Sequence, residues 1–390
     1  MVRRTHLAVL VAGLAVSVLA VSVVYAATNS YVSTEAEAAT RSGGAATLAD
    51  ASASGGSAVQ FGTGSGGACP TTKRTITATD VSQVKNSGYP AGTQVYIPGS
   101  PDPWGGCFPS AANTGIPAGT TLTNYTGPCT ITTPNTTITA RTINCSLSIR
   151  AANVVIEHSK ITGGNIAIDS AGSGFILRDS EVDFGDNSDD EGLKGSNWTV
   201  QRANLYGGKR QIWCLNTCLL EDSYLHDQLM DPTGQTHESA ARVEQNTTLR
   251  HNTLWCNAVE VPPNAGCSAN QTGYPDFAPI HGNTMERNLY MATTGGTCSY
   301  GGSTNGKPYT NHAQNGHNIR LLHNVFQRGT SPNDRNYALT DKRRYTCGTY
   351  GVLRDFDNTK PGFQATGNMW DDGQLFANDS TYPYGNLSIY

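Results

Sequence analysis

Charged residues are scarce in this sequence. Asp, Glu, Lys and Arg together make up 14% of its 390 residues, against about 25% in an average soluble domain. The 30 acidic residues outnumber the 26 basic ones, and the formal net charge is −4. A chain without a basic excess lacks the electrostatic basis of general nucleic-acid binding. We therefore expect no nucleic-acid partner.

Several signatures of common enzyme classes are also missing. The sequence contains no nucleophile elbow, phosphate loop, dinucleotide-binding fingerprint or metalloprotease helix motif. Helical periodicity is almost absent, and Gly, Thr, Asn and Ser dominate. A leucine-rich repeat would need a Leu framework with helices between strands, so this composition excludes it.

The longest hydrophobic run lies at the N-terminus. Arg3 and Arg4 precede an apolar stretch over Leu7–Val24, and Ala26 ends a cleavage-site-like tripeptide. This pattern predicts a secretory signal over residues 1–26, although a run of 18 residues is also long enough for an uncleaved anchor. We expect cleavage, and hence a secreted chain with no stable membrane association. Loss of the two arginines changes the net charge from −4 to −6.

A short phrase recurs through the rest of the chain. It places one or two apolar residues before two polar residues, then Ser or Asn, any residue, and an apolar residue, as in VVIEHSKI at 154–161 and CLLEDSYL at 218–225. The marker positions are Ser159, Ser180, Ala203, Ser223, Asn252, Asn288, Asn324 and Asn368. Their separations are 21, 23, 20, 29, 36, 36 and 44 residues. A β-rich repeat that begins near 20 residues predicts a solenoid with one coil per repeat.

The phrase itself predicts a β-helix. Val154 and Ile156 alternate with their neighbours at strand periodicity, and Ser159 stands where the chain must bend. Asn side chains at equivalent bends can stack into a ladder. The interior stack should contain the residues that share the place before each bend, which are Ile156, Leu177, Val200, Leu220 and Leu249. We predict an all-β chain with a flexible linker over 27–66, followed by one solenoid domain with terminal caps over 67–390.

All ten cysteines lie after residue 68. An even count in an exported chain predicts disulfide bonds rather than a thiol site. Sequence alone does not determine the connectivity, although two short-range pairs are expected, Cys214–Cys218 and Cys256–Cys267.

These repeats resemble a known superfamily. NVVIEHSKITG followed by NIAI is similar to the repeat of right-handed parallel β-helices of the pectin-lyase-like superfamily. IWCLNTCLLEDSYLHD, CSYGG, NVFQRG and MWDDG resemble secreted actinobacterial β-helix-repeat proteins. The resemblance covers about residues 105–375, and it is specific for the fold but weak for the reaction, because one fold hosts many chemistries.

The resemblance implies a substrate groove beside the first of three sheets. The strands expected there are Asn165–Ile168, Glu191–Lys194, Gln211–Leu215, Glu238–Val243 and Phe277–His281. Long loops after residue 223 could form its walls. His158, His251 and His323 fall just before the bends and are interpreted as exterior structural positions away from the groove.

The densest ionisable cluster is DFGDNSDDEGLKG at 183–195. Carboxylates on a tight turn can bind Ca²⁺ through oxygen ligands, so Asp189, Asp190 and Glu191 are candidate metal ligands. The alternative is a solvated acidic turn, and the spacing is not that of an EF-hand.

The expected groove strands bring further ionisable residues together. The candidate catalytic residues are Lys194, His237, Glu238 and Arg242, because such side chains can transfer protons or neutralise a carboxylate. Lys194 or His237 is a better base than Arg242, since an arginine pKa lies above about 12. The candidate substrate-binding residues are Lys209, Arg210, Trp213, His226 and His281. Each of these residues taken alone is more often an ordinary surface residue, and only the set as a whole indicates a site.

Fold resemblance and this cluster together predict an enzyme that acts on an extracellular polysaccharide, as a monomer. The favoured reaction is β-elimination of a uronic-acid-containing chain. One alternative is a glycoside hydrolase that uses two carboxylates among Asp190, Glu191 and Glu238. The other is a carbohydrate-binding or adhesion solenoid without catalysis.

Overall fold

A computed structural model describes most of the chain from residue 68 onward. The described residues are 46–49, 57–60, 68–78, 91–186, 191–229, 231–275, 279–293, 295, 297–302, 316–327, 352–357 and 359–375. The chain divides into two units, Met1–Gly67 and Ala68–Tyr390. In the first unit, β1 (Ala46–Ala49) pairs antiparallel with β2 (Ser57–Gln60), within the stretch expected to be a flexible linker. The expected signal sequence lies outside the described residues.

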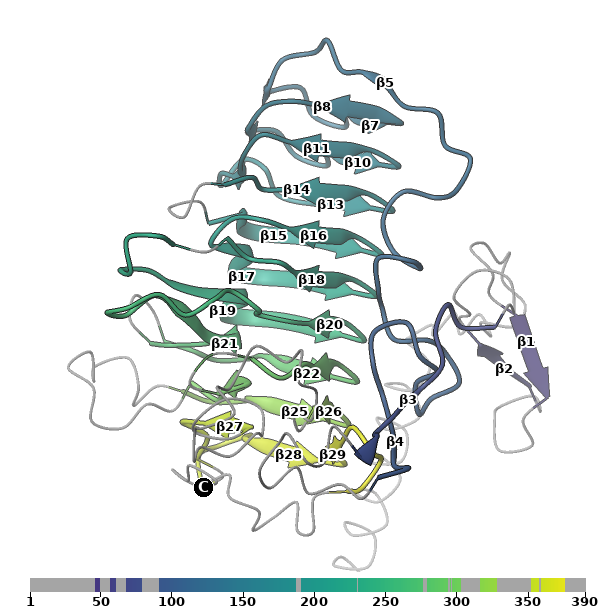
Figure 1. Ribbon diagram of the computed structural model, residues 1–390. Coiled ribbons are helices and arrows are strands. Elements are labelled where there is room, and N and C mark those ends of the chain that lie inside the picture. Colours follow the sequence, from purple (N-terminus) through teal and green to yellow (C-terminus); the bar gives the residue numbers. More distant parts are fainter. Residues whose placement is uncertain are drawn as a thin grey trace, which may run out of the picture. The chain divides into compact units, whose positions relative to one another are not determined.

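The second unit is a parallel β-helix built from three ladders of stacked strands (Figure 1). Successive coils contribute neighbouring strands to each ladder, and every pairing within the ladders is parallel. The long strands β15, β17 and β19 run through both the first and the second ladder, which therefore form one sheet. A separate antiparallel pair joins β3 (Arg74–Thr75) and β4 (Gln94–Val95).

The first ladder consists of β6 (Thr130–Ile131), β9 (Leu147–Ile149), β12 (Ile166–Ile168), β15 (Leu193–Gln201), β17 (Arg210–Glu221), β19 (His237–Arg250), β21 (Gly266–Thr272), β24 (Ser299–Tyr300) and β27 (Leu353–Arg354). The second consists of β7 (Thr137–Thr139), β10 (Val155–Glu157), β13 (Phe175–Arg178), the later halves of β15, β17 and β19, and β22 (Thr284–Glu286), β25 (Arg320–Leu322) and β28 (Gln364–Thr366). The third consists of β5 (Thr123–Asn124), β8 (Arg141–Ile143), β11 (Lys160–Thr162), β14 (Glu181–Asp183), β16 (Asn204–Tyr206), β18 (Tyr224–His226), β20 (Thr253–Leu254), β23 (Leu289–Tyr290), β26 (Val325–Phe326) and β29 (Met369–Trp370).

An unbroken apolar stack fills the interior of the coils. Its members in the second ladder are Cα partners from one coil to the next, and none of the five predicted residues is exposed to solvent. These residues are Ile156, Leu177, Val200, Leu220 and Leu249. The prediction of a β-helix with this core is therefore confirmed, because the strand alternation of the repeat phrase determines which side chains point inward.

The marker residues form the predicted ladder at the bend between the second and third ladders. The side-chain oxygen of Asn288 accepts hydrogen bonds from the backbone and side-chain nitrogens of Asn252, at 2.9 and 3.0 Å. Asn324 receives the same pair of bonds from Asn288. In the earlier coils, the Ser180 hydroxyl accepts a bond from the Ser159 backbone N–H at 3.1 Å. The bends therefore satisfy buried backbone donors from one coil to the next.

The residue just before each marker adopts a left-handed backbone conformation. His158, His251 and His323 have φ values of 50°, 51° and 56°. Histidine is enriched among the non-glycine residues found in this region, which accounts for three histidines at equivalent bends. They are bend positions away from the first ladder.

A segment over residues 91–125 runs back along the coils, from the last to the first (Figure 1). The Tyr96 backbone N–H donates to the Asp371 carbonyl oxygen at 2.7 Å. Further along, the Gly115 N–H donates to the Arg202 carbonyl at 2.8 Å, and the Tyr125 N–H donates to the Thr142 carbonyl at 2.9 Å. We call residues 91–125 the strap.

Disulfide bonds join Cys69 to Cys107, Cys129 to Cys145, Cys214 to Cys218, and Cys256 to Cys267. Both predicted short-range pairs are confirmed. Cys298 is also disulfide-bonded. The part of the chain that the structure describes contains no helix long and apolar enough to cross a membrane.

Candidate functional site

Three side chains on neighbouring first-ladder strands form the centre of the site. Lys194 on β15, Trp213 on β17 and Arg242 on β19 are Cα partners in register. The Lys194 Nζ lies 3.7 Å from the Trp213 ring centroid, and the Arg242 Cζ lies 4.8 Å from it. Because the indole ring lies between cations of the two flanking strands, cation–π attraction holds them together. We call Lys194, Lys209, Arg210, Arg242 and Trp213 the basic cluster.

Two carboxylates complete the arrangement. Glu244 Oε1 accepts hydrogen bonds from the Trp213 Nε1–H at 3.1 Å and from the Arg242 Nε–H at 2.9 Å. Glu191 lies 3.0 Å from an Arg210 nitrogen and 3.7 Å from the Lys209 Nζ. Four cations face two carboxylates, so the group carries a formal charge of +2 within a chain whose net charge is −4.

Burial and like charges destabilise the protonated forms of two cluster residues. Burial lowers the pKa of Lys194, and the positive charges of Arg210 and Arg242 add to this effect against the opposing charge of Glu191. Burial also lowers the pKa of Arg210, to about 10, while Glu191 opposes the shift. Lys194 is partly exposed, whereas Trp213 and Arg242 are buried. Lys194 is therefore the member of the trio that an incoming ligand can reach.

Arg210 has a hydrogen-bonding group with no acceptor. Its buried Nε–H finds no partner among the described residues, and the hydroxyl of Ser239, its Cα partner on β19, finds none there either. Buried donors without protein partners are uncommon, because each one costs desolvation free energy. Both groups lie at or beside the basic cluster, where an acceptor oxygen of a bound ligand would satisfy the Arg210 donor.

The predicted calcium ligands do not form a described site. Asp189 and Asp190 lie outside the described residues, and Glu191 is engaged by Arg210 and Lys209. A cation at Glu191 would meet two positive side chains at the same carboxylate, so Glu191 does not fit the role. Among the described residues, no group of three or more His, Cys, Asp or Glu side chains is arranged to hold a metal ion.

His237 lies away from the basic cluster. It is exposed at the start of β19, five residues before Arg242. At about 3.3 Å per residue, the two Cα atoms are about 16 Å apart. Lys194 and His237 therefore do not act on the same bond, although both belong to the first ladder or its edge.

Glu238 is fully buried instead of lining the groove. Its carboxyl oxygens contact the Thr236 hydroxyl at 2.7 Å and the Gly266 N–H at 3.1 Å. The register shifts between Glu238 and Ser239 where β19 pairs with β21. Such an irregularity redirects side chains, which explains why simple alternation placed Glu238 in the groove. It is not positioned as one of a solvent-facing catalytic pair.

His226 and His281 belong to other parts of the fold. His226 ends β18 in the third ladder, where its ring stacks on Tyr224 with centroids 4.0 Å apart. The His281 ring stacks on His317, with centroids 4.7 Å apart. The His281 backbone forms an isolated β-bridge with Gln245, near the bend between the first and second ladders. We expected the first-ladder strand of this coil at Phe277–His281, but the strand that occupies this place in the ladder is β21 (Gly266–Thr272). The structure therefore brings neither histidine to the basic cluster.

Trp213 and Glu244 have roles that the sequence analysis did not identify. Trp213 is 8% exposed and flanked by cations, so it organises the cluster instead of offering a free face to a sugar ring. Glu244 is 2% exposed and was not considered. The spacing Arg242-Val243-Glu244 was the available signal, because residues two apart on a strand project to the same side.

Comparison with protein-family models, curated proteins and solved structures finds no match to this chain.

Proposed function

We propose that this chain is an exported enzyme that cleaves a uronic-acid-containing polysaccharide by β-elimination at the basic cluster. The observation that carries the proposal is the concentration of cations around Lys194, whose own pKa is lowered. A local positive charge attracts a polyanionic chain in spite of the protein's acidic balance. Four disulfide bonds among the described residues are compatible with an extracellular protein.

The chemistry assigns separate roles to the cations. Arg242 and Arg210 are buried, so their positive charges act on the uronate carboxylate more through the electrostatic field of the site than by direct contact, which makes the proton on carbon 5 more acidic. Neutral Lys194 removes that proton, the bond from carbon 4 to the glycosidic oxygen breaks, and a double bond forms between carbons 4 and 5. The Lys194 ammonium then returns a proton to the leaving oxygen. A lowered lysine pKa serves this cycle, because a base works best when its pKa lies near the working pH.

The supporting residues hold this geometry. Glu244 fixes the Arg242 guanidinium through Nε and the Trp213 ring through Nε1. Glu191 anchors Arg210 from the preceding coil. Because these side chains come from neighbouring strands of the first ladder and, for Glu191, from the segment just before β15, the cluster is preorganised before a ligand binds.

A panel of uronic-acid glycans tests the proposal. Products are measured by the ultraviolet absorbance of unsaturated uronides and by reducing ends, with added Ca²⁺ and with a chelator. Both signals should appear on one or more uronate glycans and on no neutral glycan. Reducing ends without the ultraviolet signal would indicate a hydrolase instead. Binding without either product would indicate a carbohydrate-binding solenoid.

A further inference from the structure

Asp231, Thr236 and Glu238 lie before and at the start of β19, and one hydroxyl group joins them. That hydroxyl contacts both carboxyl groups. The Thr236 hydroxyl oxygen lies 2.7 Å from Glu238 Oε1 and 3.1 Å from Asp231 Oδ2. A hydroxyl has one proton to donate. If Thr236 donates to Asp231, the short contact with Glu238 requires a proton from the Glu238 carboxyl.

Asp231 has the surroundings of the ionised partner. Its Oδ2 accepts the backbone N–H groups of Gln235 at 2.9 Å and Thr236 at 2.8 Å. Its Oδ1 accepts both the N–H and the hydroxyl of Thr233, at 2.8 and 2.7 Å. These donors, led by the Thr233 hydroxyl, hold the pKa of Asp231 far below its usual range. The Thr236 hydroxyl therefore points most favourably toward Asp231.

Glu238 has the surroundings of the neutral partner. It is 0% exposed, and it forms no ion pair with any described residue. Burial raises the pKa of Glu238 to about 7, and the nearby negative charge of Asp231 acts in the same direction. A buried carboxylate without a cation is costly, and such a group keeps its proton instead.

We propose that Glu238 is a protonated carboxyl that locks the turn over residues 231–236 to the neighbouring turn over residues 261–266, and that loss of its proton releases the lock. The lock is a chain of hydrogen bonds from Glu238 through the Thr236 hydroxyl to Asp231. This inference concerns the loop that precedes β19, and it does not depend on the proposed reaction.

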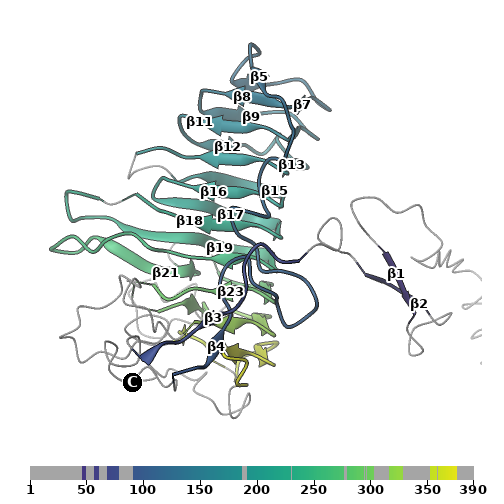
Figure 2. The same cartoon turned by 45° about the vertical axis from the view of Figure 1, so that its right-hand side comes forward.

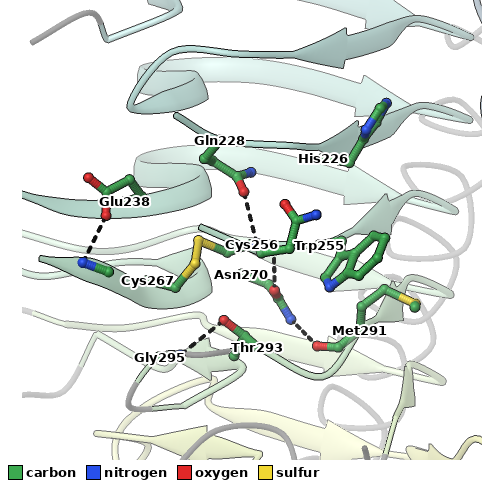
Figure 3. The surroundings of a disulfide bond; sticks show 12 residues. His226, Gln228, Glu238, Trp255, Cys256, Cys267, Asn270, Met291, Thr293 and Gly295 are labelled. Carbon is green, nitrogen blue, oxygen red and sulfur yellow. Dashed lines mark hydrogen bonds between the residues drawn. A yellow bond between two sulfur atoms is a disulfide. The ribbon is translucent and has the colours of Figure 1, made fainter. Parts of the chain in front are cut away.

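The two turns are in contact along their backbones. The Asn264 N–H donates to the Gly234 carbonyl at 3.0 Å, and the Gly266 N–H donates to Glu238 Oε2 at 3.1 Å. A Cβ on Gly234 would lie 2.1 Å from the Pro262 carbonyl oxygen, so only glycine permits this approach. Figure 3 shows Glu238 at this junction, beside the disulfide between Cys256 and Cys267. The segments that lead into β19 and into β21 project beyond the stacked strands (Figure 2).

Other charged groups face Glu238 from the surrounding elements. Arg210 on β17 interacts with it electrostatically, and the opposing charge of Glu238 would favour the protonated arginine. His237 is its chain neighbour, and Glu260 lies against Gly266 on the adjoining turn. Loss of the Glu238 proton places two carboxylates on one hydroxyl. The positive charge of Arg210 opposes this effect, but the burial of Glu238 and the charge of Asp231 outweigh it, because the pKa of Glu238 is raised. The turn therefore becomes less stable as Glu238 ionises.

Amide hydrogen exchange measures the lock directly. Protection of Gln235, Thr236 and Gly266, corrected for intrinsic exchange, should be greatest below the ordinary glutamate pKa and should fall as pH rises to about 7. The opening equilibrium should increase by up to about 10²-fold and then level off. Glu238→Gln, which keeps a donor toward Thr236, should remove this dependence and be better protected than wild type at pH 8.

Two controls keep the test decisive. His237→Asn removes the neighbouring titratable group and should retain the wild-type pH dependence. Carbon-13 shifts of glutamate carboxyls in the wild-type protein should show one group titrating near pH 7, which tests the lock even if Glu238→Gln fails to fold. Titration of every glutamate below pH 5.5, or unchanged pH dependence in Glu238→Gln, would overturn the proposal.

Discussion

His251 and Asp102 are 149 residues apart in the sequence, and the His251 Nε2 lies 3.0 Å from an Asp102 carboxylate oxygen. The other ring nitrogen of His251 lies 2.6 Å from Asp222 Oδ1. Phe108 stacks on the same ring, with centroids 6.1 Å apart. A bend residue of the coils is therefore clamped between two carboxylates, one of which belongs to the strap. The strap is thereby joined electrostatically to the β-helix.

This clamp predicts a loss of stability at alkaline pH. Burial opposes the charged imidazole, but the hydrogen bonds that His251 donates to Asp102 and Asp222 outweigh it and raise the pKa of His251 to about 9. A raised histidine pKa stabilises the fold fully below about 6.5, and this stabilisation is lost as pH rises through about 9. His251→Asn, which suits the left-handed backbone, should cost on the order of 2 kcal/mol at pH 6. Thermal unfolding at pH 6 and pH 10 measures the difference.

His158→Asn is the matched control for the clamp, because His158 occupies an equivalent bend with φ near that of His251. Its effect at pH 6 should be smaller than that of His251→Asn, because among the described residues no carboxylate of the strap binds its ring in the way that Asp102 binds His251. An equal loss of stability in His251→Asn at pH 6 and pH 10 would contradict an ionic clamp.

Lys194 provides the sharpest test of the proposed reaction. Lys194→Ala should lower the rate of β-elimination by roughly 10²–10⁴-fold, the usual contribution of an acid–base group. In the wild type, the rate should rise as pH approaches the lowered pKa of Lys194 from below, because the neutral amine is the base. Initial rates on the best glycan of the panel measure both effects.

Lys160→Ala is the control for Lys194→Ala, since Lys160 pairs with Glu181 on the third ladder. It should retain the wild-type rate and pH profile. A wild-type rate in Lys194→Ala, with a substrate in hand, would place the chemistry elsewhere on the molecule.

The repeat phrase was enough to predict the β-helix, because its alternation of apolar and polar residues identifies which side chains point inward. Leu177 and Val200 are stacked for the same local reason in each coil. The strap carries no repeat, and its contacts are as remote as that between Tyr96 and Asp371. Local patterns contain no information about such pairings, so the strap could not be derived from them.

The candidate site was predictable only where strand register stayed regular. Lys194, Trp213 and Arg242 align because regular pairing brings them together. Glu238 was misplaced because the irregularity at Glu238 and Ser239 is invisible in the sequence. Alternation along a strand predicts which face of the sheet each side chain occupies when the pairing is regular. An irregularity in the pairing changes that face for the residues beyond it.

The disulfides should differ in their contribution to stability. Cys69–Cys107 spans 38 residues, whereas Cys214–Cys218 spans 4. The loop-entropy relation gives about 4 kcal/mol for the longer loop and about 2 kcal/mol for the shorter one. Paired Cys→Ser variants, compared by denaturant unfolding, measure the two contributions. A larger loss for the Cys214/Cys218 pair would show that loop entropy does not dominate. Thiol titration of the denatured protein should first show no free cysteine.

Asn288 tests how much the buried ladder contributes to the solenoid. Its side chain accepts two bonds from Asn252 and donates to the Leu249 carbonyl and to Asn324, each at 2.9–3.0 Å. Asn288→Ala leaves the Asn252 and Leu249 groups buried without partners, and each such group costs about 1–3 kcal/mol. We expect a loss of about 3 kcal/mol in urea unfolding. Asn144→Ala, where an exposed Asn accepts one bond from Thr162, should lose less than about 1 kcal/mol. Equal losses in the two variants would mean that the buried ladder stabilises the coils no more than an exposed hydrogen bond does.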